Sequence, residues 1–153
     1  MRSRVYIDTS VIGGYYDEEF KEATRAFFER FKRGEIIFIV SDLLELELMG
    51  APPRVKELLT KFPSGKFESV SISEEIIKLA DAYIKDKVVG KTSLEDCRHI
   101  AMATVHRADV LASWNFKHIV NLDRIKGYNS VNLKYGYQLL EIRSPKDLIN
   151  YGD

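Results

Sequence analysis

Short apolar runs alternate with longer segments of helical periodicity along this chain. Strand-like runs rich in β-branched and aromatic residues lie at 5–7, 36–40, 67–72, 109–113 and within 137–145. Apolar stripes with the spacing of a helix predict helices at 20–33, from 42 to about 50–53, at 54–62, from 73 to about 86, at 93–108 and after residue 144. Strands that alternate with helices over the whole length predict an α/β fold of three layers, with a mostly parallel sheet of four to five strands between the helices.

The boundaries of several predicted elements carry their own signals. Ser41, Ser73 and Ser93 each precede a helical stripe and are candidate N-caps, because their hydroxyls can accept a free amide of the first turn. Gly34 is a plausible stop for the helix at 20–33. The run at 36–40 is apolar throughout, which is typical of a strand covered on both faces.

Composition narrows the class of protein. The 153 residues fit a single domain spanning 1–153, and 45% hydrophobic with 30% charged residues is the profile of a soluble globular protein. The 23 basic and 23 acidic residues leave no net charge, so nucleic acid would have to be held by local patches or metal ions. Cys97 is the only cysteine, which fits a reducing cytoplasm. No apolar run approaches the ~20 residues of a membrane span, and no signal peptide precedes the first strand.

Asp8 stands where the first predicted strand leaves the core, in the stretch "VYIDTSVIGG". In open parallel sheets, ligands bind beyond the carboxyl ends of the strands, near the point where the strand order reverses. A carboxylate at that position can also serve only to cap the turn that follows, together with Thr9 and Ser10. Taken alone, Asp8 fits the capping role better.

Two more acids stand at the ends or on the faces of predicted helices. Glu47 falls within the apolar arc of its helix, whereas Glu45 lies about 200° away around the wheel. An unpaired charge in that arc is costly, so Glu47 indicates a functional site, a buried salt bridge to a Lys or Arg, or a surface helix whose apolar face is loosely defined. Asp96 lies in the first turn of the helix at 93–108, where an acid also complements the helix dipole.

The three acids together suggest more than each does alone. The end of a strand, the apolar face of a helix and the start of another helix could bring Asp8, Glu47 and Asp96 together. Carboxylates that converge repel one another unless a cation neutralises them, and hard oxygen ligands suit Mg²⁺ or Mn²⁺. The pattern therefore predicts a divalent metal site.

These residues also carry a family resemblance over nearly the full length. The stretches "VYIDTSVIGG", "IVSDLLELELMGAP", "LEDCRHIAMATVHRADVLASWNFKHIVN" and "IRSPKDLI" resemble PIN-domain nucleases, and among these the VapC-like toxin subunits of VapBC-type toxin–antitoxin pairs. The family's acids at the end of strand one, in the helix after strand two and at the start of a later helix correspond to Asp8, Glu47 and Asp96. The resemblance implies a PIN-like fold with a metal site at these positions.

One position departs from the family pattern. Many members carry a fourth aspartate after the strand at 109–113, and here Asn115 stands at that position. An amide oxygen can bind Mg²⁺ or orient a water, but it brings no charge, which puts a second metal ion in doubt. Asn115 could equally be a turn residue without contact to the site. Ser113, at the end of the same strand, could help to orient the cluster.

The implied reaction is hydrolysis of a phosphodiester bond by water that a metal ion activates. The resemblance implies an endoribonuclease with an RNA substrate, a cognate antitoxin as partner and a homodimer. Basic residues near the motifs could contact phosphates, although solvated surface charge is the more common role: Lys85, Lys87, Lys91, Arg98, Lys117 and His118.

Other aromatic and histidine residues are not assigned to the site. His99 and His106 lie about 20° apart on the helix wheel, a spacing that fits a metal pair but more often reflects packing at a helix surface. Trp114, Tyr15 and Tyr16 could stack on bases, but packing is the expected role.

Three alternatives compete with the nuclease interpretation. A phosphatase of the haloacid dehalogenase type needs a second acid two residues after the first, where this chain has Ser10. A dinucleotide-binding enzyme needs a glycine-rich turn that Gly13-Gly14 does not supply. A PIN-like module that binds RNA or protein with weak or no cleavage is the strongest alternative, because Asn115 replaces an acid.

Overall fold

A single parallel sheet forms the centre of the protein. The computed structural model describes residues 2–63 and 66–149. Its five strands lie in the order β3-β2-β1-β4-β5, and every neighbouring pair is parallel. The strands are β1 (Ser3–Ile7), β2 (Ile36–Ser41), β3 (Phe67–Val70), β4 (Val110–Ala112) and β5 (Glu141–Arg143). The α/β class and the parallel sheet predicted from the sequence are therefore confirmed.

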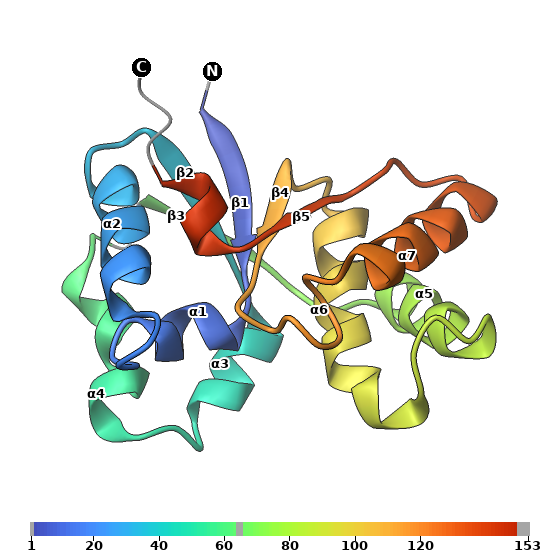
Figure 1. Cartoon of the computed structure of the whole chain (residues 1–153), viewed down its shortest axis with the longest axis horizontal. Helices are drawn as coiled ribbons and strands as arrows, with labels where there is room; N and C mark the ends of the chain where they lie inside the picture. The colour runs from blue at the N-terminus through green and yellow to red at the C-terminus, as the bar shows by residue number, and fades with distance from the viewer. Residues whose placement is uncertain (1, 64–65, 150–153) are drawn as a thin grey trace.

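Helices cover both faces of the sheet, and Figure 1 shows α1 to α4 on one side and α5 to α7 on the other. The α-helices are α1 (Thr9–Gly14), α2 (Lys21–Lys32), α3 (Asp42–Leu48), α4 (Pro53–Lys56), α5 (Glu74–Lys85), α6 (Leu94–Val105) and α7 (Leu122–Lys134). Short 3₁₀ segments are η1 (Leu58–Lys61), η3 (Lys91–Ser93) and η4 (Pro145–Leu148). Among the helices in the described part of the chain, none combines the length and the apolar character that a bilayer span requires.

Successive side chains of the central strands point into two separate hydrophobic cores, one on each face of the sheet. In β1, Tyr6 faces the core under α5, α6 and α7, while Val5 and Ile7 face the core under α1, α2 and α3. This alternation is the period-two consequence of a strand whose side chains point to opposite faces. Aromatic packing dominates the second core, where the rings of Phe31 and Phe38 stack with their centroids 4.2 Å apart. Burial on both faces explains why residues 5–7 of β1 and 36–40 of β2 are apolar or aromatic.

The strand order creates a switch point at the middle of the sheet. The chain runs outward from β1 through β2 to β3, then returns to place β4 on the other side of β1. Ile7 pairs with Ala112, so Asp8 and Ser113 leave the sheet side by side at the carboxyl ends of β1 and β4. The switch point is where a ligand site is expected in this fold class.

The structure corrects two predicted elements and adds one that was not predicted. The helix expected at 54–62 is broken into α4 and η1, which suits a segment that begins with Pro52-Pro53. The last helix is only the 3₁₀ turn η4. Helix α7 was not predicted, because its sequence has a weak apolar stripe and contains Gly127, where a Cβ would lie 2.7 Å from Cγ1 of Val88.

The predicted caps have different outcomes. Ser41 and Ser73 accept the backbone N–H of Leu44 and Ile76, at 3.1 and 3.3 Å, and these two caps are confirmed. Ser93 stands at the start of α6 as expected, but its hydroxyl makes no capping bond because the 3₁₀ turn η3 leads directly into the helix.

Candidate metal centre

Asp8 is held almost completely out of solvent at the switch point. Its side chain is 4% exposed. Oδ1 accepts the hydroxyl of Ser10 at 2.6 Å and the backbone N–H of Val11 at 3.3 Å, and Oδ2 accepts the hydroxyl of Ser113 at 2.5 Å. Asp8 is thus the N-cap of α1, as the turn interpretation required, and it is also fixed from β4 through Ser113.

Burial makes the negative charge of Asp8 expensive. It raises the pKa of this carboxyl above its ordinary value, although the nearby imidazole of His99 and the hydroxyls of Ser10 and Ser113 act in the opposite direction. A simple cap does not need this degree of burial. An ionised Asp8 would be stabilised further by any cation brought to the switch point.

Glu47 faces the same end of the sheet from α3. Its side chain is 27% exposed, and it is bonded by the hydroxyl of Thr9 and by Nε2 of His99 at 2.8 Å. Glu45 on the same helix is exposed, as the helix wheel predicted. The partner of Glu47 is therefore neither Lys nor Arg, and the sequence-based choice between a site and a salt bridge omitted the histidine.

His99 was missed as a member of the site. It is 3% exposed, with Nδ1 2.6 Å from the hydroxyl of Tyr6 and Nε2 on Glu47. Burial by itself would lower the pKa of His99, but the hydrogen bond to Glu47 and the negative charges of Asp8 and Glu47 raise it above its ordinary value. Burial likewise favours the neutral form of Glu47, yet the hydrogen bond and charge of His99 lower the pKa of that carboxyl.

The two histidines of α6 have different surroundings. Nε2 of His106 lies 3.4 Å from the backbone oxygen of Ser71, whereas Nε2 of His99 is bonded to Glu47, so they do not face one site. The more informative spacing was that between Asp96 and His99, because residues three apart lie on one helix face.

Asp96 and Asn115 are joined directly. Nδ2 of Asn115 donates to Oδ2 of Asp96 at 3.3 Å, and Oδ1 of Asn115 accepts the backbone N–H of His118 at 2.9 Å. The backbone N–H of Asn115 donates to Ser113 at 3.0 Å. Asn115 is thus not an isolated turn residue. It links Asp96 to the residues that hold Asp8.

Electrostatics connect the three predicted acids. Burial raises the pKa of Asp96, the negative charge of Asp8 raises it further and that of Glu47 adds to this, whereas His118 and His99 act in the opposite direction. Each of the three acids is fixed by a different partner: Asp8 by Ser113, Glu47 by His99 and Asp96 by Asn115. The acids are held by hydroxyls, an amide and an imidazole, with no Lys or Arg bonded to any of them among the described residues.

The oxygen atoms of Asp8, Glu47 and Asp96 suit a hard divalent cation, although the side chains do not yet stand close enough together to coordinate one. Among residues 2–63 and 66–149, no three His, Cys, Asp or Glu side chains already stand as a metal-binding group. Carboxylate, hydroxyl and amide oxygens are the ligands that Mg²⁺ and Mn²⁺ prefer. Asp8, Glu47 and Asp96 would supply the charge, and His99 would hold Glu47 in place.

Comparison with solved structures identifies the fold. A toxin–antitoxin complex from Klebsiella pneumoniae matches with 19% identity and a TM-score of 0.54 over 74% of this chain and 88% of that one. VapC20 of Mycobacterium tuberculosis, a sarcin–ricin loop cleaving toxin, matches with 9% identity and a TM-score of 0.54 over 74% and 91%. VapBC2 of Rickettsia felis, bound to a DNA fragment from its promoter, matches with 11% identity and a TM-score of 0.55 over 92% and 98%.

This chain has the VapC fold. The PIN-like architecture predicted from the sequence is confirmed at the level of the fold. No family model matches the sequence, and no curated protein matches it.

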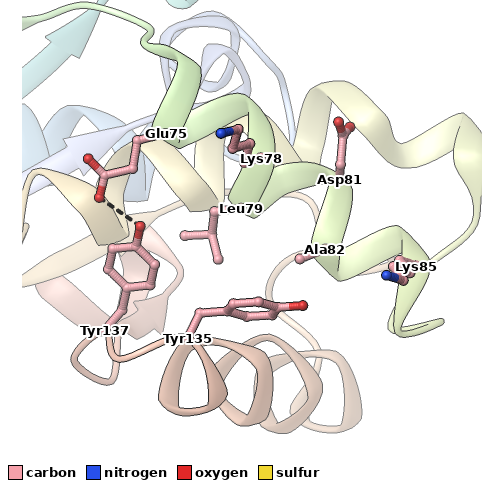
Figure 2. A pocket seen from close by; sticks show the side chains of 8 residues that line it. All are labelled: Glu75, Lys78, Leu79, Asp81, Ala82, Lys85, Tyr135 and Tyr137. Atoms are coloured by element: carbon pink, nitrogen blue, oxygen red, sulfur yellow. Dashed lines mark hydrogen bonds between the residues drawn. The ribbon is translucent and has the colours of Figure 1, made fainter.

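The other side chains considered in the sequence lie away from Asp8, Glu47 and Asp96 or only beside them. Trp114 is buried, donates from Nε1 to Thr24 at 2.9 Å and stacks on Phe20, so the packing role expected for it is confirmed. Arg98 lies 3.5 Å from Glu95, on its own helix. Lys85 lines a cavity of about 480 Å³ between α5 and the end of α7, which Figure 2 shows closed at one end by the bond from Tyr137 to Glu75. None of the predicted acids lines that cavity.

Proposed function

We propose that this protein is a Mg²⁺- or Mn²⁺-dependent endoribonuclease that acts as the toxin of a toxin–antitoxin pair. The observation that carries the proposal is the set of hydrogen bonds at the carboxyl end of the sheet, where Ser113 holds Asp8, His99 holds Glu47 and Asn115 holds Asp96. His99 is the one basic side chain bonded to these three acids among the described residues, so the positive charge at the site falls short of the negative charge. A divalent cation bound to RNA phosphate would supply the missing positive charge.

Each residue of the site would have a role that follows from its position. A bound Mg²⁺ or Mn²⁺ would lower the pKa of a water and stabilise charge on the phosphate. Ser10 and Ser113 keep both oxygens of Asp8 fixed at the end of β1. His99 fixes Glu47, and Asn115 fixes Asp96 while adding an uncharged oxygen donor nearby.

The solved structures that share this fold support the proposal of an RNA substrate and a toxin role. VapC20 is a toxin that cleaves the sarcin–ricin loop, and two of the matching structures are toxin–antitoxin assemblies. Exposed apolar side chains on α3, Leu46 and Met49, at 65% and 67% exposure, offer area that an antitoxin or a second copy of the chain would cover. A reducing cytoplasm fits Cys97, which is buried and free.

A binding module without cleavage is the second candidate. It is favoured by Asn115, which adds no charge, and by Oε1 of Glu47, which is already bonded to Thr9 and His99. An inactive site would leave those bonds intact when metal and RNA are added. The two candidates therefore differ in metal-dependent chemistry and not in fold.

Cleavage of labelled single-stranded RNA by the purified protein tests the proposal. Products are expected with Mn²⁺ or Mg²⁺ and are expected to disappear with EDTA and in Asp8→Asn. Glu47→Gln is expected to lose activity, whereas Glu45→Gln, an exposed position on the same helix, provides the matched control. Binding of RNA without metal-dependent cleavage, over varied RNA sequences, would refute the nuclease and favour the binding module.

A further inference from the structure

A cavity of about 320 Å³ opens directly beside the carboxylates. Its lining comes from α1, the loop after it, and the segment after β4: Ser10, Gly13, Gly14, Asp17, Phe20, Trp114 and Asn115. Two of these residues belong to the acid site, since Ser10 donates to Asp8 and Asn115 donates to Asp96. A molecule in the cavity would therefore lie next to whatever is bound by the acids.

One wall of this cavity is aromatic and firmly held. The rings of Phe20 and Trp114 are stacked, with centroids 4.2 Å apart and an angle of 18° between their planes. The indole N–H of Trp114 is bonded to Thr24 at 2.9 Å, and its backbone N–H donates to Ser10 at 2.8 Å. Beyond this pair, Phe116 is 49% exposed, with its ring 6.0 Å from that of Trp114. The same pair continues as a wall of an adjoining groove of about 540 Å³.

The glycines of α1 shape the cavity in different ways. A Cβ at Gly14 would lie 2.7 Å from the indole of Trp114, so only glycine lets that ring approach the helix. A Cβ at Gly13 would meet nothing within 4 Å, so its lack of a side chain leaves open space. Glycine inside a helix costs about 1 kcal/mol relative to alanine. Packing explains that cost at Gly14, whereas at Gly13 the missing side chain leaves space open.

The charges decide which part of a nucleotide fits. Asp17 stands at the cavity, with Oδ1 bonded to the backbone N–H groups of Glu19 and Phe20 at 2.8 and 3.3 Å. The adjoining groove carries Glu19 and Glu22 against one cation, Lys146. A phosphate would be repelled here, whereas an uncharged base has a π-face for the wall and amino groups for the carboxylate.

We propose that this cavity binds the base of the nucleotide next to the scissile phosphate in single-stranded RNA. The inference rests on the proposed function, because the acid site fixes the phosphate and the cavity then receives the neighbouring base. A helical duplex keeps its bases stacked in pairs, so only an unpaired nucleotide can enter. The cavity therefore selects single-stranded RNA at the cleavage position.

Filling the cavity from Gly13 tests this directly. Gly13→Leu adds bulk where a side chain meets no protein atom, and Gly90→Leu adds the same bulk at an exposed position in the loop before α6. Gly13→Leu is expected to raise Kd for a labelled single-stranded oligoribonucleotide in EDTA, and KM in Mn²⁺, about 5- to 100-fold, the range of one base stacked on an aromatic ring. Gly90→Leu is expected to match the wild type, and the affinity of Gly13→Leu for Mn²⁺ alone is expected to be unchanged.

A second measurement uses the unaltered protein. Oligoribonucleotides in which a single base is removed at successive positions are expected to bind weakly only when the missing base adjoins the cleaved bond. Equal binding by every abasic RNA, or a Gly13→Leu variant that binds RNA like wild type, would overturn the base site while leaving the nuclease intact. A Gly13→Leu variant that loses affinity for an arginine-rich peptide but not for RNA would also overturn it, because the acidic rim would then serve a protein partner. RNA binding weakened by Gly13→Leu in a protein that cleaves no RNA would refute the nuclease and overturn the position of the base beside a scissile phosphate, leaving a cavity that only binds bases.

Discussion

Nε2 of His99 lies 2.8 Å from Oε1 of Glu47. This contact joins α6 to α3 across the carboxyl end of the sheet, and both side chains would otherwise face a partly buried site without a counter-charge. On its other side His99 lies 2.6 Å from the hydroxyl of Tyr6, which is 2.8 Å from Ser41 at the start of α3. The imidazole thus fixes the one predicted acid that stands on a short helix.

Removing this imidazole should affect both stability and metal binding. His99→Ala leaves Glu47 and the hydroxyl of Tyr6 without their shared partner, and the free energy of unfolding is expected to fall by about 2–4 kcal/mol. Affinity for Mn²⁺ is expected to fall about 10- to 100-fold, as when a group that orients a ligand is removed. Urea denaturation and titration calorimetry measure the two effects, with His106→Ala as the control on the same helix. Wild-type stability in His99→Ala would show that the contact does not form.

Asp8→Asn should separate function from stability. The variant removes a charge whose burial raises the pKa of Asp8, while its amide oxygen still accepts from Ser10 or Ser113. In EDTA at neutral pH the free energy of unfolding is expected to rise by about 1–2 kcal/mol, with cleavage lost. Ser113→Ala, which removes a hydrogen-bond donor to Asp8, is expected to lower the free energy of unfolding by about 1–2 kcal/mol. Denaturation of Asp8→Asn at a lower urea concentration than wild type would mean that Asp8 serves mainly as a cap.

Asn115→Asp should make stability depend on metal. A carboxylate at this position replaces a donor to Asp96 with a like charge, so the free energy of unfolding in EDTA is expected to fall by about 1–2 kcal/mol. Mn²⁺ is expected to raise the melting temperature of the variant by more than that of wild type, because a ligand that binds only the folded state stabilises it more when its affinity is higher. Equal shifts on adding Mn²⁺ would place position 115 outside the metal site.

The two glycines of α1 should respond oppositely to alanine. Gly14→Ala forces a Cβ against the indole of Trp114 and the hydroxyl of Thr24, at 2.7 and 2.8 Å, and is expected to cost about 1–3 kcal/mol of unfolding free energy. Gly13→Ala meets no atom and is expected to gain about 0.5–1 kcal/mol from helix propensity. Thermal denaturation of the two variants compares them, and a stable Gly14→Ala would mean that Trp114 packs elsewhere.

Growth of bacteria that express the chain tests the toxin role. Expression without a cognate antitoxin is expected to slow growth, and Asp96→Ala is expected to relieve the inhibition because it removes an acid of the cluster. Glu95→Ala is the matched control, since Glu95 is exposed and bonded only to Arg98 on its own helix. Toxicity that persists in Asp96→Ala, at equal protein levels, would disconnect the acids from the phenotype.

Much of the architecture was predictable because it depends on local patterns. The apolar runs gave all five strands, and the helical stripes gave α2, α3, α5 and α6 with small errors at their ends. Helix α7 was missed because its identity depends on tertiary contacts. Position 127 requires glycine because a Cβ there would collide with Val88. The buried Asn132 is stabilised by a hydrogen bond from the hydroxyl of Tyr83 at 2.5 Å. A segment whose polar residues are satisfied only by distant partners looks like a loop in sequence.

The sequence by itself determined the strands, their burial and the positions of Asp8, Glu47 and Asp96 at the ends or faces of elements, because periodicity and capping are local properties of the chain. Only the tertiary structure decided which partners hold those acids. His99 and Glu47 are separated by 52 residues, Ser113 and Asp8 by 105, and Asn115 and Asp96 by 19. Side-chain hydrogen bonds over such separations depend on how strands and helices are ordered in space. The return of β4 to the side of β1 brings the last two pairs together. The first pair joins α6 to α3, which cover opposite faces of the sheet, across its carboxyl end.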